Sequence, residues 1–115
     1  MTAYAIAHLR TPQINDDVLD YIERIQDTLD PFGGRFIVHG PTEIDVREGE
    51  WPGTIVIIEF PSMAKATAWY DSDGYQEILP LRTRHIDATA MIVPGVPPDY
   101  DPKATAAMFR QTLSR

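Results

Sequence analysis

Cysteine is absent from the 115 residues of this chain. Disulfide bridges, thiolate catalysis, zinc fingers and iron–sulfur clusters are therefore excluded. No apolar run approaches the ~18 residues that a membrane-spanning helix needs. The N-terminal residues also lack the basic and then apolar pattern of a signal peptide. These absences predict a cytoplasmic protein.

Positive charge is scarce. Ten Lys and Arg residues stand against 17 Asp and Glu residues, which gives a formal net charge of −7. Such a surface repels phosphate backbones, so we expect no nucleic-acid partner. The length suits a single domain, and 43% hydrophobic residues is ordinary for a globular protein. We expect that domain at residues 1–95, with a C-terminal arm at 96–115.

Strand patterns alternate with helix patterns along the chain. The strand patterns lie at Ala3–Leu9, Arg35–His39, Thr54–Phe60 and Ala88–Val93. An amphipathic helix follows the first of them, and a second helical stretch, opened by Ser62 and recapped near Ser72, follows the third. This βαββαβ order predicts an α+β, ferredoxin-like domain with a four-stranded antiparallel sheet and both helices on one face.

Three further details follow from the pattern. Within the sheet, we expect the first and third strands to be neighbours that run parallel. Residues 42–46 alternate again, which favours a continuation of the second strand past a bend. The C-terminal arm should end in a short helix with Asp101 as its N-cap and Pro102 at its first position.

One face of such a sheet has no cover within the chain. An apolar sheet cannot expose a whole face without a patch well above a few hundred Å². A second copy of the chain is the simplest cover, so the sequence predicts a homodimer packed sheet to sheet, with a cavity between the two sheets.

Period-two alternation assigns the polar strand residues to that uncovered face. They are Tyr4, His8, Arg35, His39 and Glu59. If the first and third strands are parallel, His8 and Glu59 meet Arg35 at one end of the sheet, and His39 lies at the opposite end.

These groups define the candidate catalytic residues: Glu59 and His8 for proton transfer, and Arg35 to hold an anionic or enolate oxygen. The alternative is structural, with Glu59 and Arg35 forming a partly buried ion pair and His8 a satisfied polar residue. Two histidines and a carboxylate are also a ligand set for iron. The expected distance between His8 and His39 argues against it, so we expect no metal and no cofactor.

The second helical stretch supplies further candidates for ligand binding. Tyr75 and Arg82 could reach one end of a cavity, and Trp69 could stack on a ligand; with Tyr4 and His39 of the uncovered face they are the candidate ligand-binding residues. Aromatic residues at helical spacing are more often core than ligand contacts. The alternative for Arg82 is a surface ion pair with an acidic residue such as Glu77 or Asp87.

Several segments, in this order, resemble one bacterial family. They are Gly33-Gly34-Arg35-Phe36, Glu50-Trp51-Pro52, Val56-Ile57-Ile58-Glu59-Phe60-Pro61-Ser62, Ala68-Trp69-Tyr70-Asp71-Ser72, Tyr75-Gln76 and Leu79-Pro80-Leu81-Arg82. Over about residues 3–94 the chain resembles the domain-of-unknown-function family thirteen-thirty (DUF1330). The resemblance implies a dimeric α/β-barrel of ferredoxin-like protomers. The chain departs from the family pattern at His39, where arginine is common, and in the arm after Pro97.

The wider superfamily implied by this resemblance includes cofactor-free monooxygenases, muconolactone isomerases, polyketide cyclases and haem-binding barrels. We therefore expect a homodimer that binds a small anionic or aromatic molecule. The alternatives are a cofactor-independent monooxygenase or isomerase of an enolisable substrate, and a structural or interaction dimer without a ligand.

Overall fold

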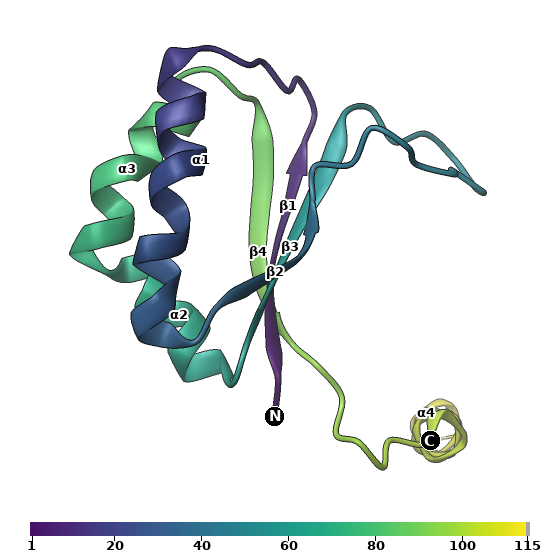
Figure 1. The fold of residues 1–115 in the computed structure, drawn as a ribbon. Coiled ribbons are helices and arrows are strands. Elements are labelled where there is room, and N and C mark those ends of the chain that lie inside the picture. Colours follow the sequence, from purple (N-terminus) through teal and green to yellow (C-terminus); the bar gives the residue numbers. More distant parts are fainter. Residues whose placement is uncertain (115) are drawn as a thin grey trace.

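The computed structural model describes residues 1–114, and it forms an α+β domain with an extended C-terminal helix (Figure 1). The strands are β1 (Ala3–Leu9), β2 (Arg35–His39), β3 (Thr54–Phe60) and β4 (Ala88–Pro94). The helices are α1 (Asp16–Leu29), the 3-10 turn η1 (Asp30–Phe32), α2 (Met63–Asp71), α3 (Asp73–Thr83) and α4 (Pro102–Leu113). The sheet has the order β2-β3-β1-β4 and is antiparallel throughout, as a ferredoxin-like fold requires.

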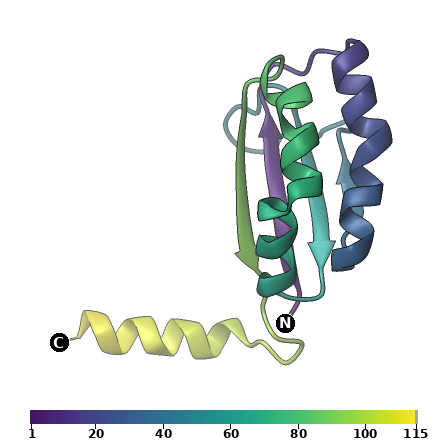
Figure 2. The same cartoon turned by 90° about the vertical axis from the view of Figure 1, so that its left-hand side faces the viewer.

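Helices α1, α2 and α3 cover one face of this sheet (Figures 1 and 2). Each begins at a side chain that caps its free backbone amides. Asn15 accepts a hydrogen bond from the Val18 amide, and Ser62 and Ser72 do the same at α2 and α3. Within residues 1–114, no helix has the length and apolarity needed to cross a membrane.

The core lies between this helix layer and the sheet. Leu29 from α1, Phe60 from β3 and Ile78 from α3 are its largest fully buried side chains. Ala3 of β1 and Ala66 of α2 are also fully buried, and their small size lets the helices approach the sheet closely. The helix-facing positions of the strands therefore form the interior of the protomer.

The expected direction of β1 relative to β3 is wrong. The two strands are neighbours, but they run antiparallel, with Tyr4 opposite Glu59 and His8 opposite Ile55. In a ferredoxin-like sheet, β1 lies between β3 and β4, and the right-handed crossovers make it antiparallel to both. His8 and Glu59 consequently lie at opposite ends of the sheet instead of meeting at one end.

A β-bulge in β2 changes the face on which His39 lies. Phe36 pairs with Ile58, but Val38 pairs with Ile57 and His39 with Val56, so the alternation shifts at residue 37. His39 therefore shares the helix-facing side with Phe36, and their rings stack at 4.2 Å. It lies at the opposite end of the sheet from Arg35 and Glu59, as expected, but at the same end as His8 and on the other face, so its expected face and its expected separation from His8 are wrong.

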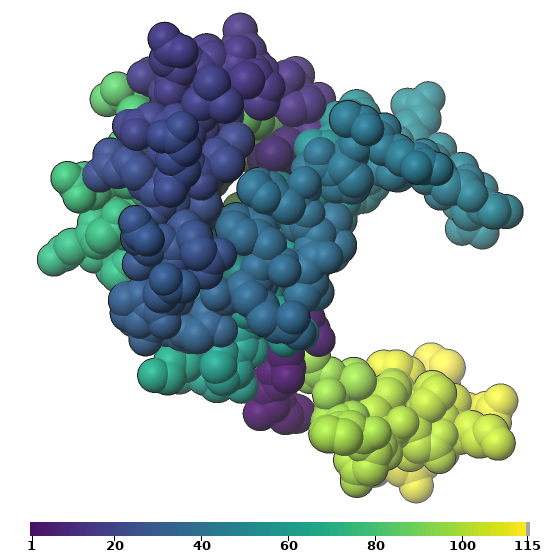
Figure 3. Space-filling view, in the orientation of Figure 1, coloured from purple at the N-terminus to yellow at the C-terminus, as the bar shows by residue number. Residues whose placement is uncertain are grey.

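Two segments extend from the side of the sheet that the helices leave uncovered (Figures 1 and 3). One is the connection between β2 and β3, residues 40–53, which contains no strand, so the expected continuation at 42–46 does not form. The other is the C-terminal arm, whose helix α4 begins with Asp101 as N-cap and Pro102 in its first turn, as predicted. The helix contains no buried residue and projects away from the body of the protomer (Figure 2).

Candidate ligand pocket

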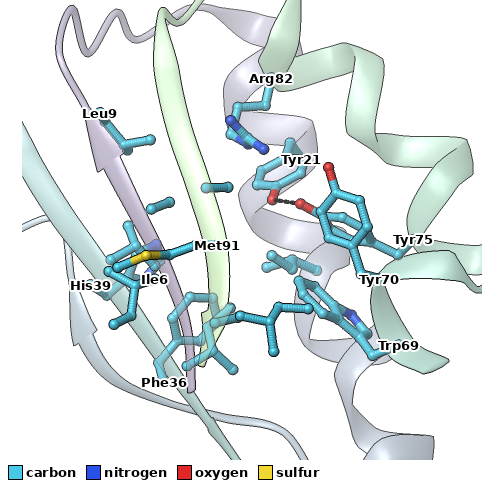
Figure 4. A pocket seen from close by; sticks show the side chains of 17 residues that line it. Ile6, Leu9, Tyr21, Phe36, His39, Trp69, Tyr70, Tyr75, Arg82 and Met91 are labelled. Carbon is cyan, nitrogen blue, oxygen red and sulfur yellow. Dashed lines mark hydrogen bonds between the residues drawn. The ribbon is translucent and has the colours of Figure 1, made fainter. Parts of the chain in front are cut away.

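A cavity of about 340 Å³ lies between the sheet and the helices (Figure 4). It is on the opposite side of the sheet from the face where the sequence predicted a site. Small side chains of two neighbouring strands, Ala5 and Ala7 of β1 and Ala90 of β4, leave the space open. The other walls are mostly aromatic: Tyr21 of α1, Phe36 and His39 of β2, and Trp69, Tyr70, Tyr75 and Arg82 of α2 and α3.

Two tyrosine hydroxyls meet at the helix side of this pocket. Tyr21 and Tyr75 form a hydrogen bond of 2.7 Å between their hydroxyl oxygens, and both side chains are buried (Figure 4). Burial raises the pKa of Tyr21, so its hydroxyl keeps its proton at neutral pH. One proton of the pair is used in the mutual bond, and the other is available to an oxygen atom of a bound molecule.

Arg82 completes the polar end of the pocket. It is 8% exposed, and its guanidinium carbon lies 5.6 Å from the centre of the Tyr21 ring, a cation–π contact. Burial acts to lower the pKa of Arg82, but the two tyrosines act in the opposite direction, and the net pKa lies above its usual value. The guanidinium is therefore charged at neutral pH.

No carboxylate within residues 1–114 forms an ion pair with Arg82. The surface alternative fails because both acidic candidates have other partners. Asp87 pairs with Arg10 at 2.9 Å, and Glu77 lies 3.7 Å from Arg24. A buried cation without an anion is unusual in a protein interior.

The aromatic wall is held in place from behind. The indole Nε1 of Trp69 donates a 3.0 Å hydrogen bond to the Thr28 hydroxyl of α1. Its ring packs on Tyr75 at 4.1 Å and on Phe60 at 5.3 Å between ring centres. Trp69 is 2% exposed, so it belongs to the core and to the pocket wall at once. The rigid support suits a binding surface for a flat molecule.

His39 lines the pocket from the sheet side, across from the helices that carry Arg82 and the tyrosine pair. Loss of solvent around the ring lowers the pKa of His39. Its imidazole is therefore neutral at neutral pH and can accept a proton. The pocket thus has a potential base on the sheet side and a cation with two phenols on the helix side.

On the outer face, the expected ion pair forms. Arg35 donates from Nε and Nη2 to the same Glu59 oxygen, at 3.0 and 2.9 Å. The Arg35 side chain is 68% exposed, and the Glu59 side chain is the more covered of the two. The ion pair therefore lies at the protein surface. Tyr4 lies opposite Glu59 on β1. None of these three residues lines the cavity.

His8 has a different set of neighbours at the other end of the sheet. Its ring stacks on Trp51 at 4.0 Å, and its Nε2 donates a 2.7 Å hydrogen bond to the carbonyl of Pro52. Next to it, Gly53 has φ +85° and lies against the Leu9 carbonyl, where a side chain has no room. His8 therefore fastens the β2–β3 connection to this end of the sheet.

Comparison with known proteins decides the family. Residues 2–96 match the family model described as a domain of unknown function, DUF1330. The chain belongs to the DUF1330 family. The comparison of this DUF1330 chain with the curated proteins finds no match.

Solved structures share the fold of this DUF1330 protein. A protein of unknown function from Rhodopseudomonas palustris, RPA0582, is 16% identical, with a TM-score of 0.58 over 84% of each chain. A protein from Thermobifida fusca YX, described as dimeric, ferredoxin-like and of unknown function, is 16% identical, with a TM-score of 0.57 over 83% of this chain and 92% of its own. A structure described as an antibiotic biosynthesis monooxygenase is 20% identical, with a TM-score of 0.52 over 84% of this chain and all of its own.

The structure brings together a subset of the predicted site residues of this DUF1330 protein. His39, Trp69, Tyr75 and Arg82 line one cavity, whereas Tyr4, Glu59, His8 and Arg35 do not. Sequence analysis missed Tyr21 as a site residue, because its helical spacing marks it as core. The sequence feature that could have identified Tyr21 is its hydroxyl, the only one in the otherwise aliphatic buried stripe of α1.

The described part of the DUF1330 chain contains no candidate metal site. Within residues 1–114, no three side chains among histidine, aspartate and glutamate come close enough to hold a metal ion. What the pocket offers is hydrogen-bond donors, one cation, one neutral imidazole and aromatic surface. This set can bind and polarise an oxygen-bearing organic molecule.

Proposed function

We propose that this protein binds a small, mainly aromatic molecule that carries one anionic or enolate-type oxygen. The observation that carries the proposal is Arg82, a buried guanidinium that faces an apolar cavity and has no carboxylate partner among the described residues. The oxygen of the ligand contacts Arg82, and the Tyr21–Tyr75 pair donates the second hydrogen bond. The rest of the molecule stacks between Trp69 and Phe36.

Electrostatics support a singly charged ligand. A buried cation is costly unless an anion or several hydrogen bonds compensate it. One carboxylate or enolate oxygen supplies this compensation in the pocket. The chain as a whole carries a formal charge of −7, which disfavours molecules with several negative charges.

The size of the cavity supports a ligand over a closed structural dimer. Ligand pockets have volumes from about 300 Å³ upward, and this one has about 340 Å³ in a single protomer. A dimer that served only as a scaffold would have no reason to keep an open space lined by a cation. A molecule with one or two rings fits the volume.

We further propose that the protein is a homodimer through the outer face of its sheet. Ile37 and Met91 are 42% and 54% exposed on the strands, and Ile55 and Ile57 of β3 are incompletely covered. The Thermobifida fusca protein of similar fold is described as dimeric, which supports a dimer here. Light scattering at micromolar concentration should give twice 13.0 kDa, and a mass of 13.0 kDa would contradict the dimer.

Ligand binding can be tested with the intrinsic fluorescence of Trp69. The chain has two tryptophans, so Trp51→Phe leaves Trp69 as the only reporter. In this background, benzoate and naphthoate should quench the fluorescence saturably, and their uncharged amides should bind at least tenfold more weakly.

Arg82→Gln should remove the preference for the carboxylate over the amide. Arg24→Gln is the matched control, because Arg24 lies on the outer side of α1 in exposed ion pairs. Equal affinity of the unchanged protein for carboxylates and amides would overturn the role of Arg82.

A second candidate function is proton transfer in a cofactor-independent isomerase or monooxygenase. The specific observation is His39, a neutral imidazole in the wall across from Arg82 and the tyrosine pair. His39 would remove a proton next to a carbonyl, and Arg82 would stabilise the resulting enolate oxygen. The enolate then takes a proton at another carbon or reacts with O₂. The fold shared with a monooxygenase supports this candidate.

Proton exchange separates this candidate from simple binding. Bound aryl ketones or enolisable acids should exchange their α-hydrogen for deuterium in heavy water, as followed by NMR. The rate should fall on acidification with a midpoint below pH 6.5, because the pKa of His39 lies below that ordinary value. His39→Gln should abolish exchange while binding persists. Exchange that continues in His39→Gln would exclude His39 as the base.

A further inference from the structure

Helix α4 carries an apolar stripe that no other part of the described chain, residues 1–114, covers. Met108, Phe109 and Leu113 are 57%, 59% and 84% exposed. Their spacing places them on one side of the helix. The helix lies outside residues 2–96, which the family model matches, so the family fold does not account for it. An exposed stripe of this kind marks an interaction surface.

A matching apolar groove lies in the connection between β2 and β3. We call it the loop groove, and it has a volume of about 310 Å³. It is lined by Ile44, Val46, Arg47, Glu48, Trp51 and Ile55. The groove is preformed, because His8 of β1 fastens Trp51 and Pro52 to the end of the sheet. Ile55 belongs to the outer face of β3, so the groove is continuous with the proposed dimer surface.

The charges of the two surfaces are complementary. Residues 43–50 contain four carboxylates and one arginine, and that arginine, Arg47, is paired locally with Asp45. Helix α4 contains Lys103 and Arg110 and no carboxylate. These two basic residues are seven positions apart, so they lie on the same side of the helix and border the apolar stripe. An acidic groove rim therefore faces a basic helix edge.

The loop groove and α4 of one protomer lie at opposite ends of its sheet. The arm leaves β4 next to Ala3, whereas the loop leaves β2 and β3 next to Leu9. Both extend on the uncovered side of the sheet (Figures 1 and 3). If the twofold axis of the dimer lies between the two sheets and is perpendicular to the strands, each end of one sheet lies against the opposite end of the other sheet. Each α4 then lies beside the loop groove of the other copy.

We propose that α4 is an exchanged arm, which docks its apolar stripe into the loop groove of a second copy of this chain. The occupant is α4 itself because its apolar surface, its charge and its position all match the groove. The inference rests on the proposed homodimer but is independent of the ligand pocket. It gives the C-terminal arm a function, namely to lock two protomers together in one orientation.

Cysteine cross-linking tests the docking directly, because the chain has no cysteine of its own. Val46→Cys and Phe109→Cys are prepared as separate proteins, mixed, allowed to exchange subunits and oxidised. A non-reducing gel should then show a disulfide-linked pair of chains. The matched control is Gln111→Cys, on the opposite side of α4, which should link to Val46→Cys at least tenfold less.

The double variant Val46→Cys/Phe109→Cys in one chain separates exchange from folding back. Exchange predicts a covalent dimer, whereas a linked monomer would show that the arm docks on its own chain and would overturn the inference. Dimers in solution without preferential linkage of Phe109→Cys over Gln111→Cys would overturn the inference and leave the dimer intact. A monomer in light scattering would overturn both.

A second measurement does not depend on cross-linking. Met108→Ser/Phe109→Ser should raise the dissociation constant of the dimer about tenfold or more, because central apolar anchors carry most of an interface's energy. Gln111→Ser should leave it unchanged. The changed residues are exposed in the protomer, so its fold tolerates them. An unaltered dissociation constant would contradict the exchanged arm.

Discussion

The two faces of the sheet differ in how their polar groups are satisfied. On the outer face, Arg35 and Glu59 neutralise each other, and His8 donates to a backbone carbonyl and stacks on a tryptophan. On the helix-facing side, Arg82 is buried and charged beside a cavity, with no carboxylate partner among residues 1–114. Charged residues alone are therefore a poor guide to a site. The unpaired charge next to open space is the better guide.

The largest expected effect concerns packing on the two faces. Ile58→Ala should lower the free energy of unfolding by about 2–5 kcal/mol, because Ile58 is fully packed between sheet and helices. Ile57→Ala, one residue away on the outer face, should cost clearly less within a protomer. It should instead make the urea midpoint depend more strongly on protein concentration. Equal losses without concentration dependence would show that the outer face has no partner.

The next effect decides which face holds the ligand. Arg82→Leu should weaken the binding of benzoate about 10- to 100-fold, the usual size for losing a hydrogen bond to a charged group. Arg35→Leu should change the affinity less than twofold, because Arg35 is on the outer face. Fluorescence titration in the Trp51→Phe background measures both. The reverse result would restore the site that the sequence placed around Glu59 and Arg35.

A smaller effect is expected from the tyrosine pair. Tyr75→Phe removes the 2.7 Å bond to Tyr21 and should cost about 1 kcal/mol in unfolding free energy, together with a severalfold loss of ligand affinity. The control on the outer face is Tyr4→Phe, which should change stability by less than about 0.5 kcal/mol. Urea denaturation monitored by circular dichroism measures both. If both variants behave alike, the hydroxyl pair has no special role in the pocket.

The fold could be predicted because its signals are local. The β1, β2 and β3 bounds follow from alternation, and the caps at Ser62, Ser72 and Asp101 follow from side chains that bond backbone amides. The site could be predicted only in part, because it depends on relations between distant strands. The predicted direction of β1 relative to β3 was wrong, so His8 and Glu59, which were expected to meet, lie at opposite ends of the sheet.

The bulge in β2 brings a residue into the pocket, whereas the strand direction separates two residues that were expected to meet. Period-two alternation assigns His39 to the outer face, and no residue type near position 37 signals the extra residue that moves it. The helical candidates were less sensitive to this kind of error. Trp69, Tyr75 and Arg82 reach the pocket because helical spacing fixes the face on which they lie.

The smallest effect is expected from the ion pair on the outer face. Glu59→Gln leaves an amide that still accepts from Arg35, and exposed pairs are worth about 0–1 kcal/mol, so unfolding free energy should fall by no more than that. Added salt should reduce the difference between the variant and the unchanged protein, since Arg35 is largely in solvent. Denaturation at low and high ionic strength measures this. A loss of several kcal/mol, or one that persists in high salt, would mean that the pair is buried in the dimer, and the contrast between the two faces would then hold only for the single protomer.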